Sequence, residues 1–178
     1  MTSTKVKTPY GSIVPETYIF TAGPNNDHLP PNQSQINAWI AYLDTYYCGA
    51  TYEATKTRTY NCHGYAWHMS EGGSPVWIDL CPTAGHHKYW LDGSYTAVAE
   101  NVATKVTYTG NHSAVRLNSN WYRSKWGPEY LVTHKPNCVL TGYGSTNGYY
   151  VNPTCHIFPL KMPKLGYSKK LYYTYTAY

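Results

Sequence analysis

The sequence predicts an α+β fold in which two helices precede an antiparallel β-meander. Three observations carry this prediction: helical spacing of apolar residues over 34–43, a helix start near residue 62, and an alternation of period two from residue 103 onward. The chain has 178 residues, enough for one domain with a hydrophobic core or for two very small ones.

The first helix is predicted over SQINAWIAYL (34–43), whose apolar residues recur at i, i+3, i+4 and i+7. Asn32 or Ser34 can accept hydrogen bonds from the first free backbone N–H groups and so cap the helix. Residues 1–31 precede it, with Pro and Gly at short intervals. We expect an irregular N-terminal arm there, with one short strand.

The second helix is predicted to begin at Asn61 or Cys62 in YNCHGYAWHM (60–69) and to end at Gly72-Gly73. The polar, Thr-rich residues 44–59 are expected to connect the two helices. The segment that follows the second helix contains aromatic residues and turn signals, and we expect an anchored loop there.

The meander is predicted from short alternating segments separated by Gly and Asn turns. Its expected strands are residues 103–108, 112–117, 121–125 and 130–134. The segment 161–178 is rich in Tyr and Lys, and we expect a C-terminal edge strand or a linker. The main domain is accordingly predicted to span residues 32–160.

The composition indicates a β-rich, loop-rich extracellular domain, because 21 tyrosines stand against two phenylalanines. We expect a secreted or cell-surface protein, although residues 1–9 contain no apolar segment typical of a secretory signal. No apolar run is long enough to span a membrane. The net charge of +5 is scattered apart from the lysines of 161–170, so we expect no nucleic-acid partner.

Five cysteines leave one thiol over if the others pair. Cys138 and Cys155 flank a Gly-, Tyr- and Asn-rich segment that would be floppy without a covalent tie, so we predict that they form a disulfide. Cys48 and Cys81 are predicted to form the second, which leaves Cys62 free. The alternative is that all five are reduced, buried side chains.

Cys62 and His112 are the candidate catalytic pair. A thiol at a helix N-terminus is close to the positive end of the helix dipole, which lowers its pKa. His112 would form the ion pair and protonate a leaving amine. Ser124 is the predicted third member, because it lies opposite His112 in a hairpin, and the two asparagines of the turn are weaker candidates. The Cys62 backbone N–H, with the Asn61 or Tyr60 side chain, would bind the oxyanion.

The segments YNCHGYAW (60–67), GNHSAVRL (110–117) and RSKWG (123–127) resemble the papain-like cell-wall amidases and peptidases, of the NlpC and CHAP types. The closer likeness is to uncharacterised bacterial domains with an N-C-x-x-x-A-W motif. The resemblance implies a papain-like fold with Cys62 as nucleophile, His112 as base and Ser124 as third member. Asn61 stands where those families usually have Asp or Ser.

From these features we expect a secreted bacterial cysteine hydrolase that cleaves amide bonds in a peptide or a peptidoglycan-like polymer. Trp67, Trp90 and Trp126 would line its substrate groove. Two alternatives are a catalytically silent papain-like surface module that forms filaments or adheres, and a carbohydrate-binding module. Self-association through the Tyr-rich termini is also expected.

No cofactor and no metal are expected from the sequence. His86-His87 is a loop pair without a carboxylate or thiol at a suitable spacing for a metal site. Asp79 and Asp92 are the acids of the middle loop. They precede His112, whereas the Asp of a transglutaminase-like triad follows its His.

Overall fold

The computed structural model describes residues 2–21, 31–79 and 85–153 of the chain. Helices and antiparallel sheets are mixed in it, which confirms the predicted α+β class. The helices are α1 (Gln33–Tyr46), α2 (Cys62–Trp67) and α3 (Lys88–Leu91). Short 3₁₀ helices lie at Met69–Glu71, Gly85–His87, Glu100–Val102 and Thr141–Tyr143. None of the helices in these ranges has the length and apolar content needed to cross a bilayer.

The largest layer is a seven-stranded antiparallel sheet in the order β5-β11-β10-β9-β8-β12-β7. The predicted meander forms its centre, where β8 through β11 pair with their neighbours in chain order. The strands are β5 (Thr51–Ala54), β7 (Thr96–Ala97), β8 (Lys105–Tyr108), β9 (His112–Arg116), β10 (Tyr122–Lys125), β11 (Leu131–His134) and β12 (Thr146–Val151).

Three strands of this sheet were not predicted, namely β5, β7 and β12. β5 lies in the segment expected to be a connection and pairs with β11 at the sheet edge. β12 lies in the Gly- and Tyr-rich segment and inserts between β8 and β7. Neither segment has a clear alternation of its own, so pairing with an existing strand decides its conformation.

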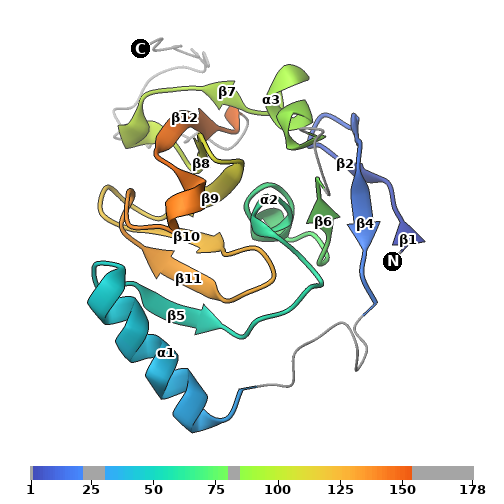
Figure 1. Ribbon diagram of the computed structural model, residues 1–178. Coiled ribbons are helices and arrows are strands. Elements are labelled where there is room, and N and C mark those ends of the chain that lie inside the picture. The colour runs from blue at the N-terminus through green and yellow to red at the C-terminus, as the bar shows by residue number, and fades with distance from the viewer. Residues whose placement is uncertain (1, 22–30, 80–84, 154–178) are drawn as a thin grey trace, which may run out of the picture.

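A smaller three-stranded sheet contains β1 (Thr2–Ser3), β4 (Thr17–Ile19) and β6 (Trp77–Ile78), while β2 (Val6–Lys7) pairs with β3 (Ile13–Val14). Residues 2–21, the described part of the N-terminal arm, therefore hold four short strands where one was expected. The middle loop contributes β6 and α3, which were also not predicted. Figure 1 shows α2 between the large sheet and the small one.

The first helix begins as predicted. Asn32 and Gln35 form a capping box, in which each side chain accepts from the other's backbone N–H. α1 packs along β5 (Figure 1) and buries Leu43 against Trp126 and Val132. It runs three residues beyond the predicted end at residue 43.

The second helix also begins as predicted, with Asn61 as its N-cap. A Cβ on Gly64 would come within 1.8 Å of the Val76 carbonyl oxygen, so only glycine allows α2 to pack this closely. α2 ends at Trp67, and a 3₁₀ turn then leads to Gly72, which has a positive φ of 91°. The helix buries Ala66 and Trp67 in the core beside β6.

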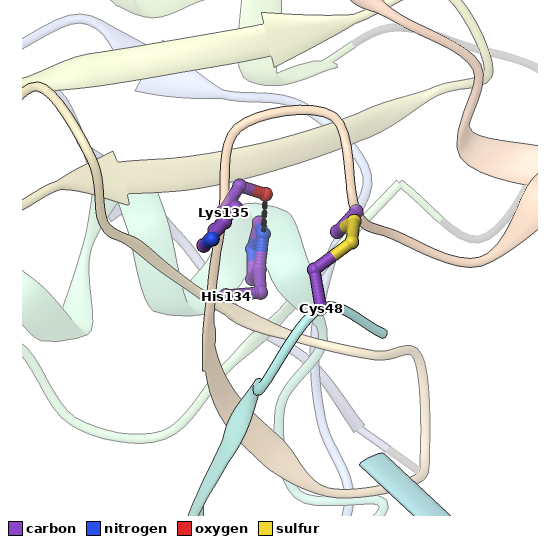
Figure 2. The surroundings of a disulfide bond; sticks show 4 residues. Cys48, His134 and Lys135 are labelled. Carbon is purple, nitrogen blue, oxygen red and sulfur yellow. Dashed lines mark hydrogen bonds between the residues drawn. A yellow bond between two sulfur atoms is a disulfide. The ribbon is translucent and has the colours of Figure 1, made fainter. Parts of the chain in front are cut away.

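The disulfide pairing differs from the prediction, because Cys48 bonds to Cys138, with 6.1 Å between the Cα atoms. Figure 2 shows this bond beside His134 and Lys135. Cys48 follows α1 and Cys138 follows β11, and the fold brings these two ends together across 90 residues of chain. The predicted partners Cys81 and Cys155 lie outside the described residues, as does the expected C-terminal strand.

Candidate functional site

Cys62 is the first residue of α2, and its thiol is free. The residue is only 6% exposed, and this burial raises the pKa of the thiol to about 11. Hydrogen bonds from the backbone N–H groups of Ser113 and His63 lower the pKa of the thiol, but by less than burial raises it. The expected lowering of the thiol pKa is therefore wrong, because desolvation outweighs the effect of a six-residue helix.

His112 begins β9, but its side chain points to the face of the sheet opposite α2. Ser113, the next residue of β9, hydrogen-bonds through its hydroxyl with His63 and Trp67 of α2. Because neighbouring residues of a strand point to opposite faces, His112 points away from α2. The His112 ring instead stacks on Tyr143, with 3.7 Å between the centroids. Among the described residues, neither of its ring nitrogens has a hydrogen-bond partner. The structure does not join this imidazole to the thiol of Cys62.

Ser124 hydrogen-bonds to His134 and not to His112. The Lys135 carbonyl accepts from Nδ1 of His134 at 2.9 Å (Figure 2), so this nitrogen carries the proton. Nε2 of His134 therefore accepts from the Ser124 hydroxyl at 2.8 Å. Burial lowers the pKa of His134 to about 4, which keeps the ring neutral at pH 7. Ser124 thus orients a histidine that the sequence analysis did not consider.

Asn61 and Tyr60, the predicted oxyanion donors, have structural contacts. The Asn61 oxygen accepts from Gly64 N–H at 2.9 Å, and its amide nitrogen donates to the Ile78 carbonyl at 2.6 Å. These bonds cap α2 and tie it to β6. Tyr60 is buried, and its ring centroid lies 5.2 Å from the Lys125 ammonium.

Two of the three tryptophans assigned to a groove are core residues. Trp67 and Trp126 are each 1% exposed, and each indole N–H donates to a buried serine hydroxyl. A ring enclosed in this way cannot contact a polymer, so both assignments are corrected. Trp90 is half-buried and stacks on Tyr150 at 4.7 Å.

Lys125 of the S-K-W-G segment is fully buried and ties three chain segments together. Its ammonium donates to the backbone carbonyls of Thr57, Gly127 and Glu129. Burial lowers the pKa of Lys125 to about 7, while the nearby Glu129 carboxylate and Cys62 act in the opposite direction. Lys125 therefore stabilises the fold by joining these three segments.

Three buried side chains converge beside α2. His63 comes from α2, Asp79 directly follows β6, and His86 belongs to the 3₁₀ helix Gly85–His87. One ligand atom from each lies within 4.8 Å of those from the other two. The set offers two imidazoles and one carboxylate, which are common ligands of divalent transition metals.

The loop backbone holds this cluster tightly. The Asp79 carboxylate accepts from the Gly85 N–H and contacts Nδ1 of His86. A Cβ on Gly85 would lie 2.4 Å from the Pro15 carbonyl oxygen, so glycine is required there. Burial lowers the pKa values of His63 and His86 to about 3 and raises the pKa of Asp79.

Sequence reasoning did not connect these three residues. His63 received no part in the predicted site, Asp79 was weighed only as a triad acid, and His86 only with His87. The available signal was weak, because the residues belong to three elements and follow no common period. The close sequence separation of Asp79 and His86, seven positions, was the part that could have been noticed.

Comparisons of the chain with protein-family models, with curated proteins and with solved structures found no match. The papain-like resemblance thus stays an expectation from its short motifs, and the geometry described above is the basis for the function proposed next.

Proposed function

We propose that this chain is a catalytically silent module of papain-like design, with a structural or adhesive function at a bacterial surface. The observation that carries the proposal is the placement of the two expected reactive groups. Cys62 begins α2, while the His112 ring stacks on Tyr143 and neither of its nitrogens has a hydrogen-bond partner among the described residues. A Cys–His pair needs the two side chains within hydrogen-bond reach.

The environment of the thiol supports the same proposal. A thiol with a pKa of about 11 is almost entirely protonated at pH 7, and only the thiolate is a nucleophile. Aromatic side chains exposed on α1, among them Tyr42 and Tyr46, would suit contact with another molecule.

The experiment that tests the proposal measures the reactivity of Cys62 in the native protein at pH 6. Iodoacetamide is added, and peptide mapping by mass spectrometry follows Cys62 separately from the other cysteines. We expect labelling slower than that of glutathione, because the thiol is buried and protonated. His112→Gln should leave the rate unchanged, since the imidazole does not contact the thiol.

A Cys62 that reacts faster than glutathione, and that loses this rate in His112→Gln, would overturn the proposal. The hydrolase hypothesis would then be favoured, in which Cys62 attacks an amide carbonyl and His112 protonates the leaving amine. His134→Gln is the matched control, because it also removes a buried imidazole from the same face as His112.

A second candidate, glycan binding, is favoured by a surface hollow of about 560 Å³ at the turn between β9 and β10. Trp121 and Asn120 line it, and Lys135 lies with its ammonium 6.0 Å from the Trp121 ring. An aromatic ring beside polar side chains is suited to a sugar. Binding to a glycan array that is lost in Trp121→Ala and kept in Tyr10→Ala would support it. Equal binding by both variants would refute it.

A further inference from the structure

The most informative feature outside the predicted site is the buried group of His63, Asp79 and His86. We propose that these three side chains bind one divalent transition-metal ion of the Zn²⁺ type, as a structural tie between α2, the end of β6 and the 3₁₀ helix Gly85–His87. The inference is independent of the proposed function, because it involves neither the thiol of Cys62 nor His112.

The spacing of the donors is the first support. Ligand atoms of a tetrahedral zinc site lie roughly 3.3 Å apart, because each bond is about 2.0–2.2 Å long. The three candidate atoms lie within 4.8 Å of one another. The rings of His63 and His86 stack face to face, with 3.8 Å between their centroids, so one ring has to turn out of the stack for both to bind the same ion. All three residues are at least nine-tenths buried, with exposures of 1%, 7% and 4% for His63, Asp79 and His86.

The hydrogen bonds of His63 are the second support. Its Nδ1 lies 2.9 Å from the Ser113 hydroxyl, which also accepts from the indole N–H of Trp67. With its proton on Nδ1, His63 would donate to this hydroxyl and present a bare lone pair at Nε2. That nitrogen is buried and has no hydrogen-bond partner among the described residues, although the Asn111 side chain is near enough to favour a protonated ring.

Metal-bound histidines usually donate their other N–H to a hydrogen-bond acceptor, which fixes the ring orientation. With the His63 proton on Nδ1, Ser113 supplies this acceptor. The Gly85 N–H holds one carboxylate oxygen of Asp79, and the other contacts His86. The ligands are thus positioned by the backbone of the loop and by β9, which is the arrangement that a metal site requires.

The burial of the group decides between two kinds of metal site. A catalytic ion keeps an open coordination position for water or substrate, whereas a structural ion is enclosed by the protein. His63, Asp79 and His86 are enclosed between α2, β6 and the 3₁₀ helix Gly85–His87. Three protein ligands leave the fourth tetrahedral position to a water molecule. Because the group is too deeply buried for a substrate to reach this position, we assign a structural function to the ion, which joins three separate elements.

The experiment uses the whole chain, stripped of metal with EDTA and titrated with ZnCl₂ in a calorimeter. We expect one ion per chain and a rise in the midpoint of thermal unfolding on binding, because the ion binds the folded state only. Asp79→Asn and His86→Gln should each weaken binding at least tenfold. His87→Gln is the matched control, since His87 is the exposed neighbour of His86, and it should bind as the parent does.

X-ray absorption of the zinc-loaded parent chain supplies a test that does not depend on the variants folding. We expect only nitrogen and oxygen neighbours at about 2.0–2.2 Å, with the multiple scattering of two imidazoles. A zinc–sulfur distance of about 2.3 Å would overturn the assignment, because it would place a cysteine among the ligands. Failure to bind one ion, or equal loss in His87→Gln, would also overturn it.

Discussion

Each face of the seven-stranded sheet contains a serine, a tryptophan and a histidine, and on each face the serine hydroxyl contacts the other two side chains. On the α2 face, the Ser113 hydroxyl contacts the indole N–H of Trp67 and Nδ1 of His63. On the other face, a second serine hydroxyl contacts the indole N–H of Trp126 and Nε2 of His134.

The two sets differ in the second nitrogen of the histidine. His134 donates from Nδ1 to the Lys135 carbonyl, so both of its nitrogens are satisfied within the backbone and core. His63 leaves Nε2 without a partner among the described residues, beside Asp79 and His86. In the set of His134, both ring nitrogens have hydrogen-bond partners within the protein. In the set of His63, one ring nitrogen is left over that could bind a ligand.

The largest expected effect concerns the face that contains His134, because the Cys48–Cys138 disulfide lies beside it (Figure 2). The double variant Cys48→Ser/Cys138→Ser should lose about 4–5 kcal/mol of unfolding free energy, because the bond closes a long loop. Urea denaturation measures this loss. Cys62→Ser is the control and should lose much less. If Cys62→Ser and the double variant lost the same unfolding free energy, the disulfide would not stabilise the fold as expected.

Removing each serine hydroxyl compares the two sets directly. Ser113→Ala and Ser124→Ala should each lose about 2–3 kcal/mol in EDTA, because each leaves two buried groups without a partner. With zinc present, Ser113→Ala should bind the ion about tenfold more weakly, while Ser124→Ala binds as the parent does. Calorimetry and urea denaturation give the two readings. The comparison fails if both variants lose metal affinity alike.

The pH dependence of stability tests the burial of His134. Its pKa is lowered to about 4 in the fold and is near 6.5 in the unfolded chain, so the unfolded state takes up a proton first as the pH falls. Stability from this group is therefore full above pH 6.5 and is lost between pH 6.5 and 4. Linkage gives a loss of about 2 kcal/mol between pH 7 and pH 5.

His134→Gln should make the pH profile in EDTA shallower by that amount. Urea denaturation at pH 7, 6 and 5 measures it, with His87→Gln as the exposed control. An unchanged slope in His134→Gln would mean that this ring is not kept neutral by burial.

The smallest effect concerns His112, whose buried nitrogens have no partner among the described residues. His112→Phe should raise the unfolding free energy by about 1 kcal/mol, because an apolar ring avoids the cost of desolvating two polar atoms and keeps the stack on Tyr143. Thermal unfolding measures the change. A loss of stability together with a change in Cys62 reactivity would indicate an interaction between the two side chains.

Local patterns made much of the fold predictable. The helix at Gln33–Tyr46 followed from apolar spacing and an Asn cap, and the start of α2 at Cys62 followed from the same kind of signal. The four central strands followed from alternation and turn residues. β6 and β12 could not be predicted, because their short sequences become strands only through partners far along the chain.

The candidate site was less predictable, because its geometry depends on contacts between distant segments. A residue at the start of a strand can point to either face, and a shift of one position reverses the direction. The sequence placed His112 at the start of a strand but could not show that Ser113, and not His112, faces α2. It also could not show that Cys48 meets Cys138 across 90 residues.

The sequence by itself determined the α+β class, the two capped helices and the central meander, because capping and periodicity act over a few neighbouring residues. Only the tertiary structure decided which side chains meet: Ser124 with His134, and His63 with Asp79 and His86. The physical reason is that these contacts depend on sheet register and on the close approach of separate elements, and neither is encoded in any local segment.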